Sequence, residues 1–378
     1  MPSHSTTFLK SVALSFDIPG DFLSAVPYGT GHINETYATV FGFQGQMRRY
    51  ILQRLNDRVF PDIPGLMENI ARVTEHLHRK LASLDGNDLE RRALTLILTR
   101  EGRAYFCDWE GSFWRAYIFI EGARTYDLIT SPLPAYEAAK AFGRFARWVS
   151  DIPEPPLRET IPGFHDTGKR LSAFLNSVVA DSMNRAAGAR PEIRFCLENE
   201  GVADALDLLR DAIPRRTAHN DTKLNNVMLD DATGTGICVL DLDTVMPGLL
   251  LCDFGDMVRT ATMRVAEDER DLTKVEASLP MYDAVTRGYM EGAGDLLTPL
   301  EREHLVTAGE VLTFECGVRF LTDYLQGDQY FRVSRPDQNL DRARVQFALL
   351  RSLRQFEPEL RRCIARATES AVNASPSQ

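Results

Sequence analysis

The segment HNDTKLNNVMLD, residues 219–230, concentrates polar side chains in one short run. It follows the pattern H-x-D-x-x-x-x-N, the spacing of a phosphotransferase catalytic loop. In such a loop the aspartate, here Asp221, accepts or orients the proton of an attacking hydroxyl group. His219 would hold the loop by hydrogen bonds, and Lys223 would offer a positive charge to the transferred phosphoryl group. The pattern therefore predicts Asp221, Lys223 and His219 as catalytic residues.

A metal site is predicted from the same run and the apolar segment after it. The amide oxygen of Asn226 is a hard ligand that suits Mg²⁺. The run ICVLDLD, residues 237–243, is typical of a strand, with Asp241 and Asp243 near its end. Because side chains alternate along a strand, both carboxylates are expected on one face. Asn226, Asp241 and Asp243 are therefore the candidate ligands for one or two Mg²⁺ ions bound to phosphates.

Plainer interpretations exist for each half of this pattern. A polar turn would explain residues 219–226, and a strand end with a turn would explain residues 241–244. The two halves together, in this order, favour chemistry. The tripeptide DFG begins at Asp253, but it is far from Asn226 and follows no comparable apolar strand. Asp253 and Asp256 are instead expected to cap or brace a helix that begins near Met257.

The elements around this segment change in character along the chain. Residues 1–120 are expected to be strand-rich around one helix at residues 64–84, where apolar residues recur at helical spacing. Residues 93–109 are expected to form a hairpin around Gly102. The rest is mostly helical. These patterns predict an α+β fold with a β-rich nucleotide-binding lobe, residues 1–120, and a helical catalytic and substrate-binding lobe, residues 121–378.

Composition excludes several classes of function. The net charge is −10, so no basic excess is available for non-specific binding of nucleic acid or anionic membranes. The 6 cysteines are scattered without a CxxC pair, which is typical of thiols in a reducing compartment. No apolar run approaches the length that spans a bilayer. A cytoplasmic protein without nucleic-acid or membrane partners is expected.

Other stretches carry a resemblance to a known family. YGTGHINETY, YILQRLNDRVF and RFLTDYLQGDQYF, with the catalytic segment and VLDLDTVMPG, resemble the N-acetylhexosamine 1-kinases. These belong to the superfamily of aminoglycoside phosphotransferases and choline kinases, a branch of the protein-kinase-like fold. The resemblance extends from about residue 25 to about residue 355. It implies ATP and Mg²⁺ as cofactors and phosphorylation of the anomeric hydroxyl of N-acetylglucosamine or N-acetylgalactosamine.

The resemblance also implies substrate residues. His32, Arg319 and Tyr330 fall where such kinases contact the sugar, and Asn34 is grouped with them. Arg319 could instead pair with Asp323 at i+4, and Tyr330 could be a core aromatic.

The pattern Gly29-x-Gly31-x-x-Asn34 resembles a phosphate-covering loop, so both glycines are expected at the nucleotide. Glycines also mark ordinary hairpins.

One departure from the kinase pattern concerns the strand lysine that contacts the nucleotide phosphates. Here ILQRLN offers Gln53 and Arg54 instead. Arg54 is the expected substitute, with Glu68 or Glu75 as its partner, although a solvent-facing arginine is equally compatible. The adenine is expected to bond backbone groups near residues 119–122, which include Glu121.

The residues leave other functions open. The acceptor could be another sugar, homoserine, choline or an aminoglycoside. The departure at the strand lysine would also suit a non-catalytic nucleotide-binding regulator. The expected partners are ATP and a small sugar, with a monomer or homodimer as the assembly.

Overall fold

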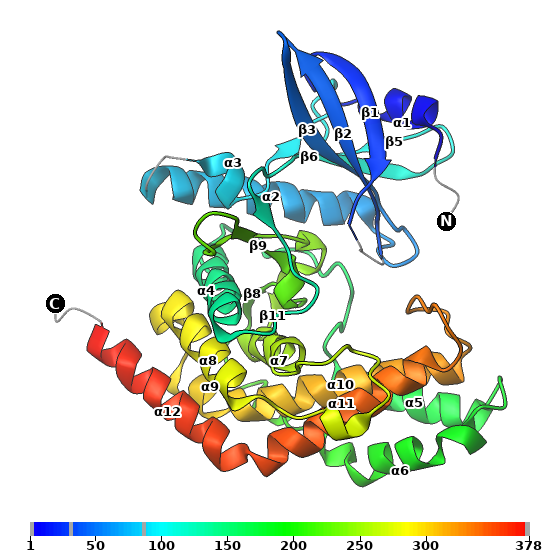
Figure 1. Cartoon of the computed structure of the whole chain (residues 1–378), viewed down its shortest axis with the longest axis vertical. Coiled ribbons are helices and arrows are strands. Elements are labelled where there is room, and N and C mark those ends of the chain that lie inside the picture. The colour runs from blue at the N-terminus through cyan, green and yellow to red at the C-terminus, as the bar shows by residue number, and fades with distance from the viewer. Residues whose placement is uncertain (1–3, 30–32, 85–87, 375–378) are drawn as a thin grey trace. The chain divides into compact units, whose positions relative to one another are not determined.

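The structure is a computed structural model that describes residues 4–29, 33–84 and 88–374, with side chains up to residue 370 (Figure 1). Its contacts divide the chain into two compact units. Unit 1 comprises residues 1–123, 152–162 and 237–246, and unit 2 comprises residues 124–151, 163–236 and 247–378.

Unit 1 is built on an antiparallel six-stranded sheet with the order β1-β2-β3-β6-β4, in which β5 also pairs with β6. The register places Glu35 opposite Arg54 and Gln53 opposite Arg115. The strands are β1 Asp21–Pro27, β2 Glu35–Phe43, β3 Gln46–Arg54, β4 Leu96–Ile97, β5 Phe106–Cys107 and β6 Phe113–Ile118.

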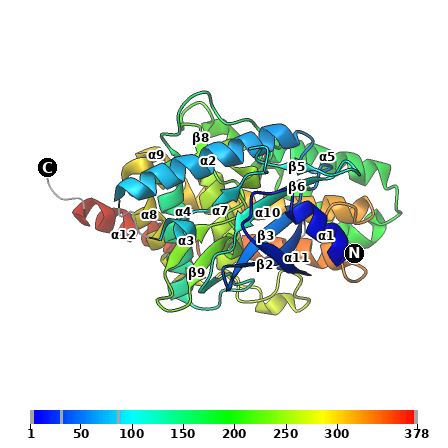
Figure 2. The same ribbon diagram turned by 90° about the horizontal axis from the view of Figure 1, so that it is seen from above.

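Helices complete unit 1. Helix α1, Thr6–Ala13, lies beside the strands (Figure 2). Its apolar residues belong to the same hydrophobic core as Trp114 of β6. Helix α2, Ile63–Leu84, buries the apolar stripe that the sequence predicts, namely Leu66, Ile70, Val73, Leu77 and Leu81. Helix α3, Leu89–Arg92, follows it.

The expected hairpin around Gly102 is wrong. Strands β4 and β5 do not pair with each other, because both pair with β6. The tight turn at Gly102 is present, with Thr99 accepting from the Gly102 N–H at 2.8 Å. A local turn signal therefore did not determine which strands are neighbours.

Unit 2 is mainly helical, and α10 is its most central helix, with contacts to α5, α7, α11 and α12 (Figure 1). Four helices begin with proline in the first turn, where the missing N–H costs nothing. The α-helices are α4 Pro132–Val149, α5 Thr167–Ala180, α6 Arg190–Glu198, α7 Leu250–Ala261, α8 Leu279–Ala293, α9 Pro299–Glu303, α10 Leu305–Leu325, α11 Gln338–Gln355 and α12 Glu357–Ala374.

Short elements carry the polar segment of unit 2. Strand β8, Arg216–Ala218, precedes it, and the 3₁₀ turn Leu224–Asn226 and strand β9, Val227–Asp230, follow. Strands β7 Ala123–Arg124, β10 Gly236–Val239 and β11 Met246–Gly248 lie where the chain passes from one unit to the other.

Close packing of α4 on α8 depends on glycine. A Cβ at Gly143, Gly288 or Gly292 would collide with backbone atoms of the facing helix, so larger residues would force the helices apart. Helix α4 therefore has a fixed position from which Phe142 and Phe145 reach the ring of His219.

The α+β class is confirmed, with a β-rich first unit and a helical second unit. The division into lobes differs from a single boundary at residue 120, because residues 152–162 and 237–246 pack with the first unit. In the part of the chain that the structure describes, no helix is long and apolar enough to cross a membrane.

Candidate active site

The segment after β8 is held rigidly inside unit 2. His219 is fully buried against the rings of Phe142 and Phe145, whose centroids lie 5.3 and 5.6 Å from its own. Its Nδ1 accepts the backbone N–H of Asp221 at 3.3 Å. Asn220 has a positive φ of 64°, a conformation that non-glycine residues rarely adopt. The packed histidine thus orients the backbone that carries Asp221, in the role predicted for it.

Asp253 braces this loop from α7. Its carboxylate accepts the backbone N–H of His219 at 3.0 Å and that of Asn220 at 2.7 Å, while Thr222 donates its hydroxyl to the Asp253 carbonyl at 2.5 Å. Burial raises the pKa of Asp253 above its usual range. The expectation of a helix starting near Met257 is wrong, because α7 begins at Leu250.

Asp221 lies in a compact polar group with Lys223 and Asn226. Lys223 Nζ is 3.0 Å from Asp221 Oδ1, and the Asn226 amide donates to the carbonyl and carboxylate of Asp221 at 2.9 and 3.2 Å. Burial raises the pKa of Asp221, but the charge and hydrogen bond of Lys223 outweigh it, so the pKa lies below its usual range. Asp221 is therefore an ionised acceptor at neutral pH.

A buried ion pair connects this loop to α10. His165 Nε2 lies 2.8 Å from the Asn220 carbonyl oxygen, and its Nδ1 lies 2.9 Å from Glu315 Oε1. The other oxygen of Glu315 accepts the hydroxyl of Thr167 at 2.7 Å. Burial lowers the pKa of His165, yet the charge of Glu315 outweighs it and the net pKa is raised. Sequence reasoning missed this pair, because nothing local marks His165 and Glu315 as neighbours.

Arg319 follows Glu315 by one turn of α10 and is surrounded by aromatic rings. Its guanidinium carbon lies 5.3 Å from the ring centroid of Phe164, 5.7 Å from that of Tyr330 and 5.5 Å from that of Phe331. Among the described residues its nitrogens have no hydrogen-bond or ion-pair partner. The alternative of a core tyrosine is wrong, because Tyr330 is 47% exposed.

The alternative ion pair between Arg319 and Asp323 is also wrong. Asp323 Oδ1 accepts the backbone N–H of Gln329 at 2.9 Å and that of Tyr330 at 2.7 Å. Its Oδ2 accepts the backbone N–H of Phe331 and the amide of Asn339, both at 2.9 Å. Asp323 therefore fixes the α10–α11 loop, residues 326–337, which carries Tyr330.

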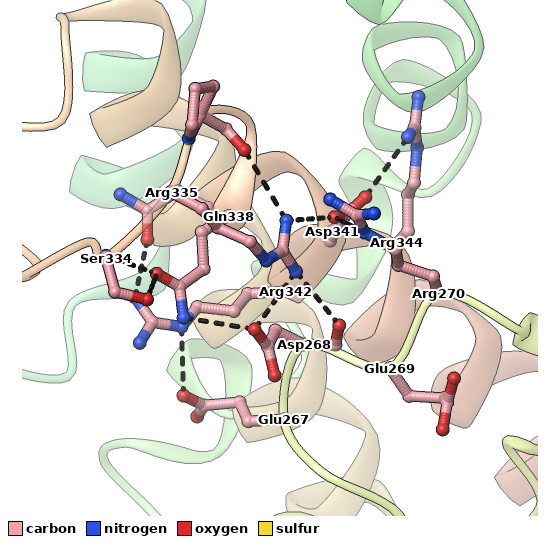
Figure 3. Close-up of polar contacts among 12 residues, drawn as sticks. Glu267, Asp268, Glu269, Arg270, Ser334, Arg335, Gln338, Asp341, Arg342 and Arg344 are labelled. Carbon is pink, nitrogen blue, oxygen red and sulfur yellow. Dashed lines mark hydrogen bonds and ion pairs between the residues drawn. The ribbon is translucent and has the colours of Figure 1, made fainter.

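The far end of the α10–α11 loop is held by an ionic network (Figure 3). Arg335 reaches Asp341 at 2.6 Å and Asp268 at 3.0 Å, and Gln338 also donates to Asp268 at 3.0 Å. Gln338 in turn accepts the Ser334 N–H at 2.6 Å. Both ends of the loop are thus tied down, so that Tyr330 occupies a defined position in unit 2.

The residues after β10 depart from the expected geometry. Strand β10 ends at Val239, Asp241 adopts a left-handed conformation with φ 55°, and Asp243 lies in the 3₁₀ turn Leu242–Thr244. Strand alternation therefore does not relate the two aspartates, and that part of the reasoning is wrong. Asp241 is exposed, and its role as a metal ligand remains a prediction.

Asp243 is instead the centre of a buried network within unit 1. Its side chain forms an ion pair with Arg115, which is 2% exposed and also donates to Gln53 at 2.9 Å. Its second oxygen accepts the Asn34 amide at 2.6 Å, and Asn34 in turn accepts the Asn56 N–H at 3.1 Å. These contacts give Asp243 and Asn34 a structural function; their predicted metal and substrate roles are untested.

The expected pairing of Arg54 with a glutamate of α2 is wrong. Arg54 forms an ion pair with Glu35 on the neighbouring strand at 2.8 Å, and Glu68 pairs with Arg158 at 2.9 Å. The buried cation on this part of the sheet is Arg115. Cross-strand register explains the difference, because Glu35 lies directly opposite Arg54.

The remaining nucleotide candidates lie in unit 1. Gly29 has φ 76°, the left-handed region that favours glycine, whereas Gly31 and His32 lie outside the described residues. The Glu121 side chain forms an ion pair with Arg49, and the Glu121 carbonyl accepts a hydrogen bond from Arg91 at 2.9 Å. The nucleotide roles of Gly29 and Glu121 stay predictions.

A family model described as the phosphotransferase enzyme family matches residues 24–287, more than half of the chain. The chain belongs to this family. It is thus a phosphotransferase. The match covers all of the segment from His219 to Asp243, but ends before Arg319 and Tyr330.

Solved structures share the kinase-like fold of this phosphotransferase. Spectinomycin phosphotransferase, in complex with ADP and spectinomycin, is 13% identical and has a TM-score of 0.55, with 98% of this chain and 100% of that chain covered. Choline kinase from Cryptosporidium parvum Iowa II is 12% identical, with a TM-score of 0.58 and coverage of 97% and 99%. Amicoumacin kinase, in complex with AMP-PNP and Ca²⁺, is 11% identical, with a TM-score of 0.56 and coverage of 91% and 92%.

Proposed function

We propose that this phosphotransferase uses ATP and Mg²⁺ to phosphorylate the anomeric hydroxyl of an N-acetylhexosamine. The observation that carries the proposal is the group formed by Asp221, Lys223 and Asn226 on a loop that His219 and Asp253 hold rigid. The resemblance to N-acetylhexosamine 1-kinases supplies the acceptor.

In this proposal Asp221 orients the sugar hydroxyl and receives its proton as the phosphoryl group is transferred. Transition states of phosphoryl transfer have little bonding to the nucleophile, so correct orientation matters more than strong basicity. A carboxylate with a lowered pKa suits that task. Lys223, 44% exposed, can balance the charge of Asp221 or of the phosphoryl oxygens.

Asn226 and Asp241 are the proposed ligands of Mg²⁺. The Asn226 amide nitrogen is committed to Asp221, so that its oxygen is the end available to a cation. Among the described residues no group of three or more His, Cys, Asp or Glu side chains converges. Mg²⁺ takes few protein ligands and keeps waters and substrate phosphates, so two oxygen ligands suit it. When bound, the ion neutralises charge on the ATP phosphates.

Acceptors that carry amines fit unit 2 poorly. The residues beside the catalytic loop include Arg319 and Arg170, and the carboxylate of Glu315 is engaged by His165 and Thr167. A cationic acceptor such as choline or an aminoglycoside would meet like charge here, which is unfavourable. Neutral or acidic hydroxylated acceptors are favoured.

The test is an ADP-release panel over N-acetylhexosamines, other sugars, homoserine, choline and aminoglycosides. Phosphorus NMR of the product shows whether the new phosphate is on the anomeric oxygen. Asp221→Asn is expected to reduce kcat at least 100-fold, within the range attributed to acid–base groups, with an unchanged circular dichroism spectrum. Phosphorylation at another oxygen, or near wild-type turnover by the variant, would contradict the proposal.

A further inference from the structure

Two arginines of unit 2 lie near the catalytic loop with unused donors. Among the described residues Arg319 makes ring contacts and no hydrogen bond or ion pair, and Arg170 on α5 donates one hydrogen bond, to the Phe164 carbonyl at 2.9 Å. The Nε of Arg170 is buried and has no hydrogen-bond partner in the part of the chain that the structure describes. In native proteins a buried polar atom without a partner is uncommon, because desolvation without compensation is costly, and such an atom points to a bound water, ion or ligand.

The two guanidinium groups are close enough to affect each other. Burial lowers the pKa of Arg170, and the charge of Arg319 lowers it further. Nearby carboxylates do not neutralise them fully. The carboxylates whose charge reaches Arg170 are Glu315 and Asp166, and each already pairs with another basic residue, His165 and Lys169 respectively. The group therefore carries excess positive charge.

Arg319 lies among aromatic rings, and its N–H donors are uncommitted within the described residues. Phe164, Tyr330 and Phe331 lie near the guanidinium, so that its carbon is within 5.3–5.7 Å of each ring centroid. Rings near a guanidinium remove water and restrict its motion, while the N–H donors in its plane stay available. Such donors match the two oxygens of a carboxylate or phosphate.

The position of Arg170 and Arg319 in unit 2 suggests that they contact the acceptor. His165 bonds the carbonyl of Asn220, which precedes Asp221, and Arg319 lies one turn beyond the His165 partner Glu315. Phe164 directly precedes His165 in the chain. The two arginines therefore border the catalytic loop, within the same unit.

We propose that Arg170 and Arg319 form a subsite for an acidic substituent of the acceptor, so that the preferred substrate is an acidic N-acetylhexosamine rather than a neutral one. The sugar part of this inference rests on the proposed function. The acidic substituent rests on the two arginines alone.

The experiment measures kcat/KM for matched acceptor pairs. The carboxylate probe is N-acetylmuramic acid, compared with its methyl ester, and the phosphate probe is N-acetylglucosamine 6-phosphate, compared with N-acetylglucosamine. At least a tenfold preference for one acidic member is expected, and the pair that shows it identifies the source of the charge. Equal values within both pairs would overturn the subsite.

Variants then locate the effect. Arg170→Gln and Arg319→Gln are each expected to bring the acid-to-neutral ratio close to one without changing the KM for ATP, and Arg319→Lys should keep part of it. Arg287→Gln, which removes an exposed positive charge of α8, is the matched control and should keep the full ratio. A ratio that survives both glutamine variants would refute the assignment. If a variant does not fold, the wild-type ratios still decide.

Calorimetry with AMP-PNP present separates failure of the subsite from failure of the proposed function. If no N-acetylhexosamine is phosphorylated but an acidic member binds at least tenfold more tightly than its neutral counterpart, the function fails and the subsite stands. If neutral and acidic sugars are phosphorylated equally well, the function stands and the subsite fails.

Discussion

Asp323→Asn tests whether the α10–α11 loop is a preformed part of the acceptor site. The carboxylate accepts four donors, three of them consecutive backbone N–H groups of Gln329, Tyr330 and Phe331. An asparagine offers one oxygen and one NH₂ group, so about two of the four bonds are lost and two donors face another donor. The substitution changes the shape of the side chain very little.

The magnitude follows from those two bonds. A hydrogen bond to a charged group contributes about 1.5–3 kcal/mol to stability, so losing two of them should destabilise the folded conformation of the loop by about 3–6 kcal/mol. The other tie, from Arg335 to Asp268 and Asp341, remains. We therefore expect local release of Tyr330 rather than global unfolding. A loss of about 3 kcal/mol corresponds to roughly a 100-fold rise in the KM for the acceptor.

The assay varies acceptor and ATP separately, with thermal denaturation and hydrogen exchange of residues 326–337 alongside. Faster exchange in this loop, a raised acceptor KM and an unchanged KM for ATP are expected. Asp283→Asn is the control, because Asp283 accepts from Arg287 and Arg366 on another face of unit 2. An acceptor KM within about threefold of wild type would refute the reasoning, as would an equal rise in both KM values.

Three further predictions concern buried polar groups. Arg115→Met leaves Asp243 buried without its cation and should lower the free energy of unfolding by about 3–5 kcal/mol in urea; a loss below about 1 kcal/mol would contradict the importance of this pair. Asp253→Asn weakens two bonds to the catalytic loop and should lower kcat at least tenfold, whereas a change confined to KM would count against a bracing role. The pKa of His165 is raised and that of Glu315 lowered, so their stabilisation is fully present between the unfolded values of about 4.3 and 6.5. It is lost as pH rises through the raised pKa of His165 or falls through the lowered pKa of Glu315. The difference in unfolding free energy between wild type and His165→Gln should thus be larger at pH 5.5 than at pH 9, and equal differences would disprove it.

Sequence reasoning succeeded where the relevant residues are close along the chain. The five apolar positions of α2 are buried as predicted, because a helix brings residues three and four apart onto one face. Asp221, Lys223 and Asn226 lie within six positions, so a tight turn necessarily places them in contact. The histidine of the motif also orients the loop as predicted.

Sequence reasoning failed where a local pattern depended on how the rest of the chain folds. Alternation at Asp241 and Asp243 required the strand to continue, but the backbone turns left-handed after Val239 and Leu240. The partner of Arg54 depended on which strand lies beside β3, and that neighbour presents Glu35. Both errors have the same cause: the surroundings of a residue were inferred from its own segment alone.

The sequence by itself determined the α+β class, the helical faces and the polar loop with Asp221, because periodicity and close spacing act over a few residues. Only the tertiary structure decided which charges meet. Arg115 and Asp243 are 128 residues apart, and His165 and Glu315 are 150 apart. A buried charge needs some partner, but that requirement does not say which one, since any compatible group that folding brings near can satisfy it. The donors of Arg170 and Arg319 that have no partner among the described residues likewise became visible only once their neighbours were in place.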